Sequence, residues 1–175
     1  MPRIPSFAFS RSVIIAVRSG PDANYNCPGQ IVITGEAKAV AEAGNALKEA
    51  GARRVLPLKV SGPFHSPMMQ PAGEELAKVF AGVSMNPLKV PYVANINAEV
   101  ITDCGKIEEL LVAQVSGSVR WQQSVETMIR EGVDTFVEIG PGKTLTGFLR
   151  KIDKNVKSYH IGSWEEAVLV CEELK

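Results

Sequence analysis

The sequence predicts an α/β fold in which helices flank a mostly parallel sheet, and three observations support this. Helical and strand patterns alternate along the chain from residue 23 onward. Several predicted strands are short runs rich in β-branched residues, such as Ile31-Val32-Ile33. Glycine follows two predicted helices, at Gly51 and Gly132, where helices commonly end. Such alternation places functional groups at the carboxyl edge of the sheet.

Residues 23–60 predict an incomplete ferredoxin-like small subdomain. Asn24 to Gln30 reads as a strand end with a Pro-Gly turn, so the strand over 31–35 forms a hairpin. A helix over 36–50 and a strand over 54–60 follow. We interpret this stretch as three quarters of a βαββαβ module that lacks its opening.

Residues 61–175 predict a larger α/β unit whose sheet starts midway. Its strands are predicted over 90–95, 135–139 and 158–161. Apolar periodicity predicts helices over 71–81, 106–115, 122–131 and 144–151, and a last helix that starts near residue 163.

The first 22 residues differ from the rest, because they contain arginines and serines but no acidic residue before Asp22. They superficially resemble an organelle transit peptide, but they lack amphipathic helical spacing, and their apolar run is too short for a secretory signal. We interpret residues 1–22 as an atypical leader, displaced or non-native. Val13 to Val17 within it also fits a short buried strand.

The composition is that of an ordinary soluble domain. Nineteen Lys and Arg residues balance nineteen Asp and Glu residues, and 6% of the residues are aromatic, so we expect neither nucleic acid nor a membrane as a partner. Cys27, Cys104 and Cys171 lie far apart, without the Cys-x-x-Cys spacing of zinc and redox sites. We therefore expect a cytoplasmic protein with no metal and no cofactor.

The most informative local feature is a histidine between two prolines, in Gly62-Pro63-Phe64-His65-Ser66-Pro67. It follows one predicted strand and precedes a predicted helix, so His65 projects from a strand-to-helix corner. An imidazole held there exchanges protons near neutral pH. A surface histidine is the plainer interpretation of this segment taken alone. The chain contains no Gly-x-Ser-x-Gly, the elbow that would present a serine to this base.

Two other features have plain structural interpretations. Gly140-Pro141-Gly142-Lys143 is glycine-rich ahead of a helix, but it lacks the phosphate-loop spacing, so a tight strand-to-helix turn is favoured. His160 lies in a predicted strand, and a structural role is favoured. Lys143 and Arg150 share one side of a predicted helix, where they are solvated or contact an acidic partner.

Four motifs in order resemble malonyl-CoA:acyl carrier protein transacylases from about residue 23 to the C-terminus. In sequence they are Asn24-Tyr25-Asn26-Cys27-Pro28-Gly29-Gln30-Ile31-Val32-Ile33-Thr34-Gly35, Gly62-Pro63-Phe64-His65-Ser66, Val119-Arg120-Trp121 and Glu138-Ile139-Gly140-Pro141-Gly142-Lys143-Thr144-Leu145. The resemblance implies a partial acyltransferase fold, with 61–175 as the C-terminal part of the α/β domain.

The resemblance also implies site residues and partners. His65 matches the family's general base, and the backbone carbonyl of Arg120 matches the group that orients it. Asn24 and Asn26 match positions near the acyl-CoA site. The implied reaction is ping-pong transfer of malonyl from coenzyme A to acyl carrier protein in fatty acid biosynthesis, by a [acyl-carrier-protein] S-malonyltransferase.

The family's nucleophilic serine and its malonate-binding arginine have no counterpart in this chain. We therefore expect a C-terminal portion that is inactive alone and associates or aggregates through an exposed sheet edge. The alternative is a noncatalytic remnant that binds acyl carrier protein or a complementary N-terminal fragment. A small ligand-sensing α/β domain is a third, weaker interpretation.

Overall fold

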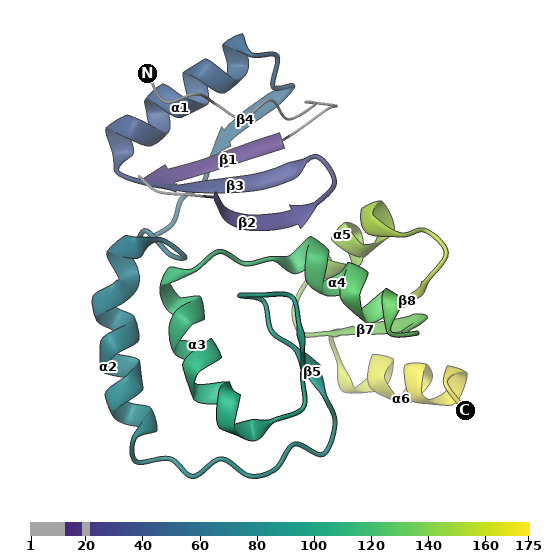
Figure 1. The fold of residues 1–175 in the computed structure, drawn as a ribbon. Coiled ribbons are helices and arrows are strands. Elements are labelled where there is room, and N and C mark those ends of the chain that lie inside the picture. The colour runs from purple at the N-terminus through teal and green to yellow at the C-terminus, as the bar shows by residue number, and fades with distance from the viewer. Residues whose placement is uncertain (1–12, 19–21) are drawn as a thin grey trace.

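The computed structural model describes residues 13–18 and 22–175, with side chains from residue 23 onward. Its first layer is a four-stranded sheet of β1 (Val13–Arg18), β2 (Asp22–Cys27), β3 (Gln30–Gly35) and β4 (Arg54–Pro57), in the order β2-β3-β1-β4 (Figure 1). The helix α1 (Ala37–Glu49) packs on this sheet. The predicted hairpin is confirmed, since β2 and β3 pair antiparallel around Pro28-Gly29.

The strand predicted at Val13 to Val17 is also confirmed, as β1. It lies between β3 and β4 and runs parallel to both. Three residues separate β1 from β2, too few for a crossover helix, so the two strands run in opposite directions and β1 is parallel to β3. The burial predicted for its side chains, and the rest of the leader at 1–12 and 19–21, lie outside the described residues.

The ends of α1 and β4 have clear local causes. Glu36 caps α1 by accepting hydrogen bonds from the backbone N–H groups of Lys38 and Ala39, each at 3.0 Å. The strand predicted over 54–60 ends earlier, at Pro57, since proline has no N–H to extend the ladder. The chain from 58 to 66 is therefore irregular, and it carries the histidine.

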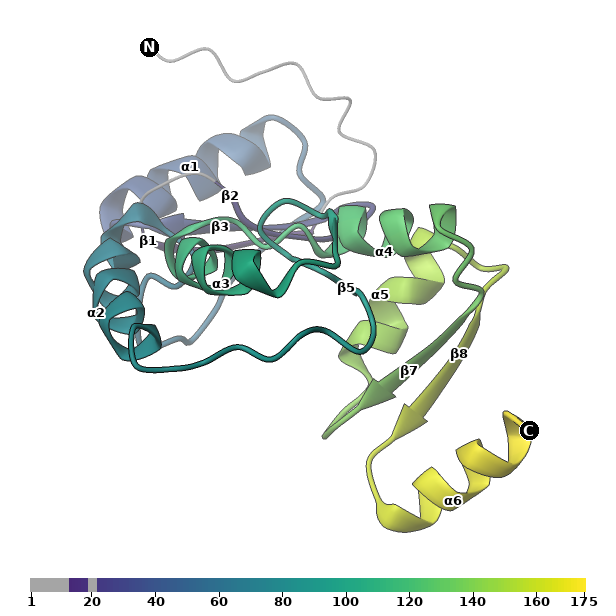
Figure 2. The ribbon, with the colours of Figure 1, turned by 60° about the horizontal axis from the view of Figure 1, so that its bottom comes forward.

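Two helices lie side by side below the small sheet. They are α2 (Gln70–Phe80), which follows the short 3₁₀ turn η1 (Pro67–Met69), and α3 (Ile107–Ser116), which follows η2 (Cys104–Lys106) (Figures 1 and 2). The buried Gly73 permits this packing, because a Cβ there would lie 3.3 Å from the carbonyl oxygen of Val112. The position of α3 is thus fixed against the segment that follows His65.

The strand predicted over 90–95 is shorter than expected and has an unpredicted partner. β5 (Tyr92–Val93) pairs antiparallel with β6 (Val100–Ile101). The turn between them places Ala98 at φ +60° and is closed by a hydrogen bond from Ala98 N–H to the Ala94 carbonyl at 2.8 Å.

The C-terminal part is a parallel β-α-β unit with a helix on either side in the chain. Its elements are α4 (Trp121–Arg130), β7 (Thr135–Ile139), α5 (Thr144–Ile152), β8 (Lys157–Ile161) and α6 (Trp164–Glu173). β7 and β8 pair in parallel from Thr135 with Lys157 to Ile139 with Ile161, and they extend away from the small sheet (Figure 2). The predicted α/β class is confirmed.

Hydrophobic side chains remain exposed at the end of this unit. Ile139, the last residue of β7, and Trp164, the first of α6, are each 78% exposed. Among the described residues, β7 pairs with β8 alone, so its other edge is open.

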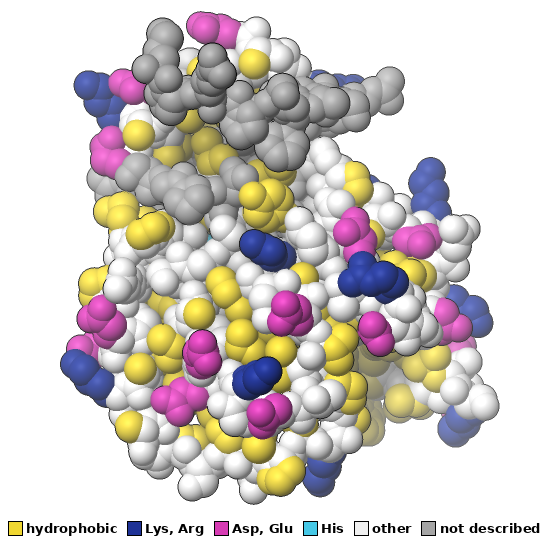
Figure 3. All heavy atoms as spheres, in the orientation of Figure 1, with side chains coloured by type: hydrophobic (Ala, Val, Ile, Leu, Met, Phe, Trp, Pro, Cys, Tyr) yellow, Lys and Arg dark blue, Asp and Glu magenta, His cyan; other side chains and the backbone are white. Residues whose placement is uncertain are grey.

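No helix in the described part of the chain has the length and apolar character needed to cross a bilayer. Acidic and basic side chains are interspersed over the face in Figure 3, with neither sign gathered into one patch.

Candidate active site

His65 lies in the irregular segment between β4 and η1, and its backbone conformation is unusual. Its φ of +58° is in the left-handed region, which residues with a Cβ rarely adopt. Such strain persists only where the surroundings hold it, and it gathers at functional sites. The predicted corner is confirmed, although a loop rather than the strand itself presents the ring.

One ring nitrogen of His65 is fixed by a distant helix. Nδ1 lies 3.0 Å from the backbone carbonyl oxygen of Gln114, in α3. A carbonyl only accepts hydrogen bonds, so the neutral ring carries its proton on Nδ1. Nε2 then has a free lone pair, and no described residue donates to it, which is the arrangement that a general base requires.

A pocket opens beside this ring. Its lining combines two polar strand residues, Asn24 of β2 and Thr34 of β3, with His65 and with apolar side chains that include Leu58, Val60 and Phe64. The structure thus brings Asn24 and His65 to one pocket. Asn26 does not line it, because β2 bulges between the paired residues Tyr25 and Cys27, where Asn26 lies.

The segment ahead of α4 joins this region to the small sheet. Val119 donates to the Ala23 carbonyl at 2.7 Å, and its own carbonyl accepts from Tyr25 N–H at 2.8 Å. Through these bonds the chain before Trp121 extends the edge of β2, which carries Asn24. The third motif of the sequence therefore lies beside the first.

The structure differs from the expectation for Arg120. The carbonyl that faces Nδ1 of His65 belongs to Gln114, whereas the Arg120 carbonyl accepts from Ser124 N–H at 2.8 Å. The reason is that Arg120 is the N-cap residue of α4, so its carbonyl starts the hydrogen-bond ladder of that helix. No sequence signal marks Gln114, since its contribution is a backbone atom.

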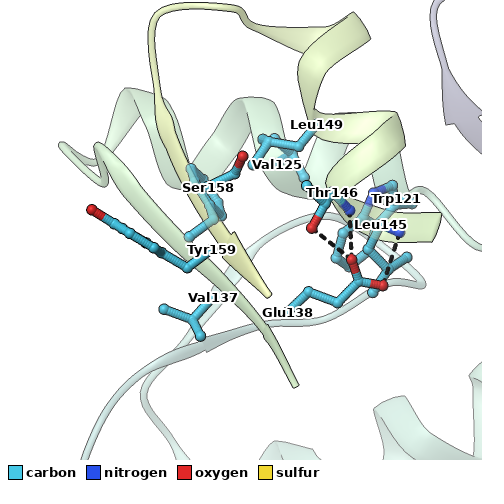
Figure 4. A pocket seen from close by; sticks show the side chains of 10 residues that line it. Trp121, Val125, Val137, Glu138, Leu145, Thr146, Leu149, Ser158 and Tyr159 are labelled. Atoms are coloured by element: carbon cyan, nitrogen blue, oxygen red, sulfur yellow. Dashed lines mark hydrogen bonds between the residues drawn. The ribbon is translucent and has the colours of Figure 1, made fainter. Parts of the chain in front are cut away.

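The glycine-rich segment at 140–143 forms the predicted strand-to-helix turn. Gly140 and Gly142 have φ values of +137° and +86°, which favour glycine. Glu138 in β7 accepts hydrogen bonds from Leu145 N–H at 3.0 Å and from the N–H and hydroxyl of Thr146 at 2.8 and 2.7 Å (Figure 4). A carboxylate therefore occupies the start of α5, where a phosphate would otherwise bind.

The charge of Glu138 is stabilised by these contacts. Burial disfavours the ionised carboxylate, but the hydrogen bonds from Thr146 and Leu145, with His160 nearby, lower its pKa below the ordinary value. Figure 4 shows Glu138 among the side chains that line a largely apolar pocket between α4, α5, β7 and β8. Sequence reasoning missed this role of Glu138, because it precedes Thr146 by eight positions and not by the spacing of a capping box.

The remaining candidates have structural or surface positions. Nε2 of His160 lies 2.9 Å from the Gly140 carbonyl oxygen, so this ring supports the turn. Burial raises the pKa of the Cys27 thiol, which disfavours the thiolate form. Lys143 and Arg150 are exposed. The described part of the chain contains no cluster of three or more His, Cys, Asp or Glu side chains that could hold a metal ion.

Comparison with known protein families gives one extended match. Residues 20–168 match the family model described as acyl transferase domain. The matched region includes His65, Gln114 and Glu138, and thus both the candidate base and the turn before α5.

Curated relatives and solved structures agree with this match. The chain is 44% identical over 153 residues to the malonyl CoA-acyl carrier protein transacylase of Bacillus subtilis, covering 87% of this chain and 48% of the relative. It is 45% identical over 129 residues to that of Escherichia coli K12, covering 74% and 42%. The acyl-carrier-protein S-malonyltransferase of Bartonella henselae superimposes with a TM-score of 0.83 at 42% identity, covering 87% of this chain and 49% of that one.

A further solved structure contains a partner protein. A malonyl-transacylase in complex with its type II polyketide acyl-carrier protein superimposes with a TM-score of 0.83 at 38% identity, covering 87% of this chain and 49% of that one. The chain spans about half the length of the curated relatives it matches.

Proposed function

The chain belongs to the acyl transferase domain family, and on that premise we propose that it supplies the general base of a malonyl transfer from coenzyme A to acyl carrier protein. The observation that carries the proposal is the ring of His65, whose Nδ1 faces the Gln114 carbonyl while Nε2 is without a donor among the described residues. The names of the relatives supply the acyl group and the acceptor.

The first half-reaction opens the thioester of malonyl-CoA. Nε2 of His65 takes the proton of a serine hydroxyl as the oxygen attacks the thioester carbonyl carbon. The tetrahedral intermediate collapses by breaking the C–S bond, and the coenzyme A thiolate leaves with the proton from Nε2. The malonyl group is then esterified to the serine.

The second half-reaction reverses the roles of nucleophile and leaving group. The pantetheine thiol of acyl carrier protein gives its proton to Nε2, and its sulfur attacks the ester carbonyl. The C–O bond to serine breaks, and the serine oxygen recovers the proton. No cofactor enters this scheme beyond the coenzyme A that carries the substrate.

The chain has no Gly-x-Ser-x-Gly segment, so the proposal assigns the serine to a second stretch of polypeptide. The open edge of β7 and the exposed Ile139 and Trp164 support a complementary segment there. By this proposal the chain alone forms no acyl-enzyme.

Three further assignments belong to the same proposal. Asn24 contacts the thioester or pantetheine, supported by its place in the pocket of His65, and Asn26 is a weaker candidate for the same role. Lys143 and Arg150 contact the acidic carrier protein. The protein works in the cytoplasm, supported by the absence of disulfides among the three cysteines.

Reconstitution tests the proposal. The chain is mixed with the part of the Bacillus subtilis relative that it does not match, since it covers 48% of that protein. Malonyl-CoA and acyl carrier protein are added, and intact-mass spectrometry follows the malonyl group. We expect malonylated carrier protein only when both pieces are present, and at least about 10²-fold less with His65→Ala, as for loss of a general base.

The alternative, a noncatalytic binding remnant, predicts a different result. A complex between the two pieces, or between the chain and carrier protein, that never transfers malonyl would favour it. A malonyl adduct on the isolated chain would contradict both proposals, because it would require a nucleophile within this sequence.

A further inference from the structure

Ser66 follows His65 in the chain and is completely buried, with 0% of its surface exposed. Its hydroxyl donates to the backbone carbonyl of Pro63 at 2.6 Å. Its own carbonyl accepts from Met69 N–H at 2.9 Å, which starts η1. Ser66 therefore joins the loop ahead of His65 to the helical segment behind it.

The hydrogen bond from Ser66 to Pro63 closes a short backbone turn that contains His65. Within this turn His65 has a left-handed φ of +58°, which is unfavourable for a residue with a Cβ. A buried hydroxyl that bonds a backbone carbonyl is well suited to hold such a conformation. Without the bond, the unfavourable backbone conformation has one restraint fewer.

The direction of the His65 ring depends on this conformation. Gln114, whose carbonyl meets Nδ1, lies 49 positions along the chain, in a helix that packs against α2. The acceptor is therefore held by the packing of α3 against η1 and α2, whereas the ring is held by the loop that contains His65. A change in φ at His65 turns the ring relative to the Gln114 carbonyl and breaks the contact that selects the Nδ1–H tautomer.

We propose that Ser66 is a positioning residue, whose hydroxyl holds the backbone of His65 so that Nδ1 donates to Gln114 and the lone pair of Nε2 stays available. The use of the Nε2 lone pair as a general base rests on the proposed function. The ring tautomer itself is a property of this chain, and it is measurable without any acyl transfer.

Long-range ¹H–¹⁵N NMR of the full chain at pH about 8 tests this, because it reports which nitrogen of each imidazole ring carries the proton. The chain has two histidines, and the structure assigns them opposite tautomers. His65 carries its proton on Nδ1. In His160 the shorter contact, 2.9 Å from Nε2 to the Gly140 carbonyl, favours the proton on Nε2, while Nδ1 lies 3.5 Å from Oε2 of Glu166. His160 is thus an internal reference in every spectrum.

Ser66→Ala should lower the Nδ1–H to Nε2–H ratio of His65 about fivefold, the effect expected of one lost neutral hydrogen bond, and leave His160 unchanged. Ser124→Ala is the matched control, since Ser124 is 1% exposed and its hydroxyl has no hydrogen-bond partner. It should leave both rings unchanged. An unchanged His65 ratio in folded Ser66→Ala would overturn the proposal, as would an equal change in Ser124→Ala.

Ser66→Cys serves if the alanine variant does not fold, because a thiol has similar shape but is a weaker donor. Ser66→Cys should lower the Nδ1–H to Nε2–H ratio of His65 by less than the alanine variant would. An unchanged ratio would overturn the proposal. Malonyl transfer by the reconstituted assembly distinguishes the role of Ser66 from the proposed function. A tautomer shift without any transfer in the unmodified assembly contradicts the proposed function and leaves the role of Ser66 intact.

Discussion

The carboxylate of Glu138 accepts two hydrogen bonds from Thr146, one from its backbone N–H at 2.8 Å and one from its hydroxyl at 2.7 Å. Together with the bond from Leu145 N–H at 3.0 Å, they tie the end of β7 to the first turn of α5. The turn at 140–143 is therefore closed by a side chain on the strand before it. Loss of this carboxylate should loosen both elements.

Glu138→Gln should lower the free energy of unfolding by about 1 kcal/mol at neutral pH, the usual effect of removing a helix cap. It should also weaken the acid dependence of stability. The folded pKa of Glu138 lies below the ordinary 4.5, so its contribution is complete above pH 4.5 and disappears as the pH falls through the lower folded pKa. Urea unfolding across that range measures both effects.

The control for this prediction is Glu42→Gln, a carboxylate on α1 with 69% of its side chain exposed and one weak ion pair at 4.0 Å. It should leave the stability curve nearly unchanged. Some acid dependence should persist in Glu138→Gln, because the hydrogen bond from Gly162 N–H lowers the pKa of Glu166 as well. Equal curves for the Glu138 variant and the unmodified chain would contradict the capping role.

Gly117 should not tolerate a side chain, since an added Cβ would collide with Cδ1 of Ile96 and lie 2.9 Å from the Ala113 carbonyl oxygen. Gly117→Ala should destabilise the chain by about 1–3 kcal/mol, as overpacking commonly does. Gly147→Ala in α5 is its counterpart, because no atom lies within 4 Å of an added Cβ there. It should stabilise the chain by about 0.4–1 kcal/mol. Thermal unfolding distinguishes the two, and equal shifts would contradict this packing.

Cys27 should react far more slowly with iodoacetamide than Cys171. Cys27 is 2% exposed, and burial raises the pKa of its thiol, so both access and the thiolate fraction are low. Cys171 is exposed on α6. Peptide mapping after a short exposure should find the label at residue 171, and denaturant should equalise the two sites. Rapid labelling of native Cys27 would contradict its buried position.

Local patterns predicted most of the elements, because apolar periodicity and glycine ends act over short distances. The strand predicted over 135–139 is β7 with the same bounds, and the helix predicted over 122–131 differs from α4 by one residue at each end. The position of His65 at a corner was predictable from the same signals. These features depend on neighbours in the sequence.

The missed features depend on partners that residue identity does not mark. β6 is two residues long and exists as a strand only through its pairing with β5. The carbonyl opposite His65 is that of Gln114, and a backbone oxygen leaves no trace in residue identity. Arg120 was expected there from a motif, but its carbonyl is used by α4. Side-chain identity therefore located the candidate base, and only the packing of α3 located the carbonyl that faces its Nδ1.

The open edge of β7 gives the last prediction. β7 pairs with β8 on one side, and Ile139 at its end is 78% exposed, so a second strand can add to this edge. The chain alone should self-associate, and Ile139→Lys should reduce its association, because edge lysines oppose strand addition. Light scattering over a concentration series measures this association.

The matched control is Val79→Lys, at a residue that is 65% exposed in the helix α2 and therefore lies on no strand edge. If both lysines reduced association equally, general surface hydrophobicity would explain it. A monodisperse unmodified chain would show that this edge recruits no second copy.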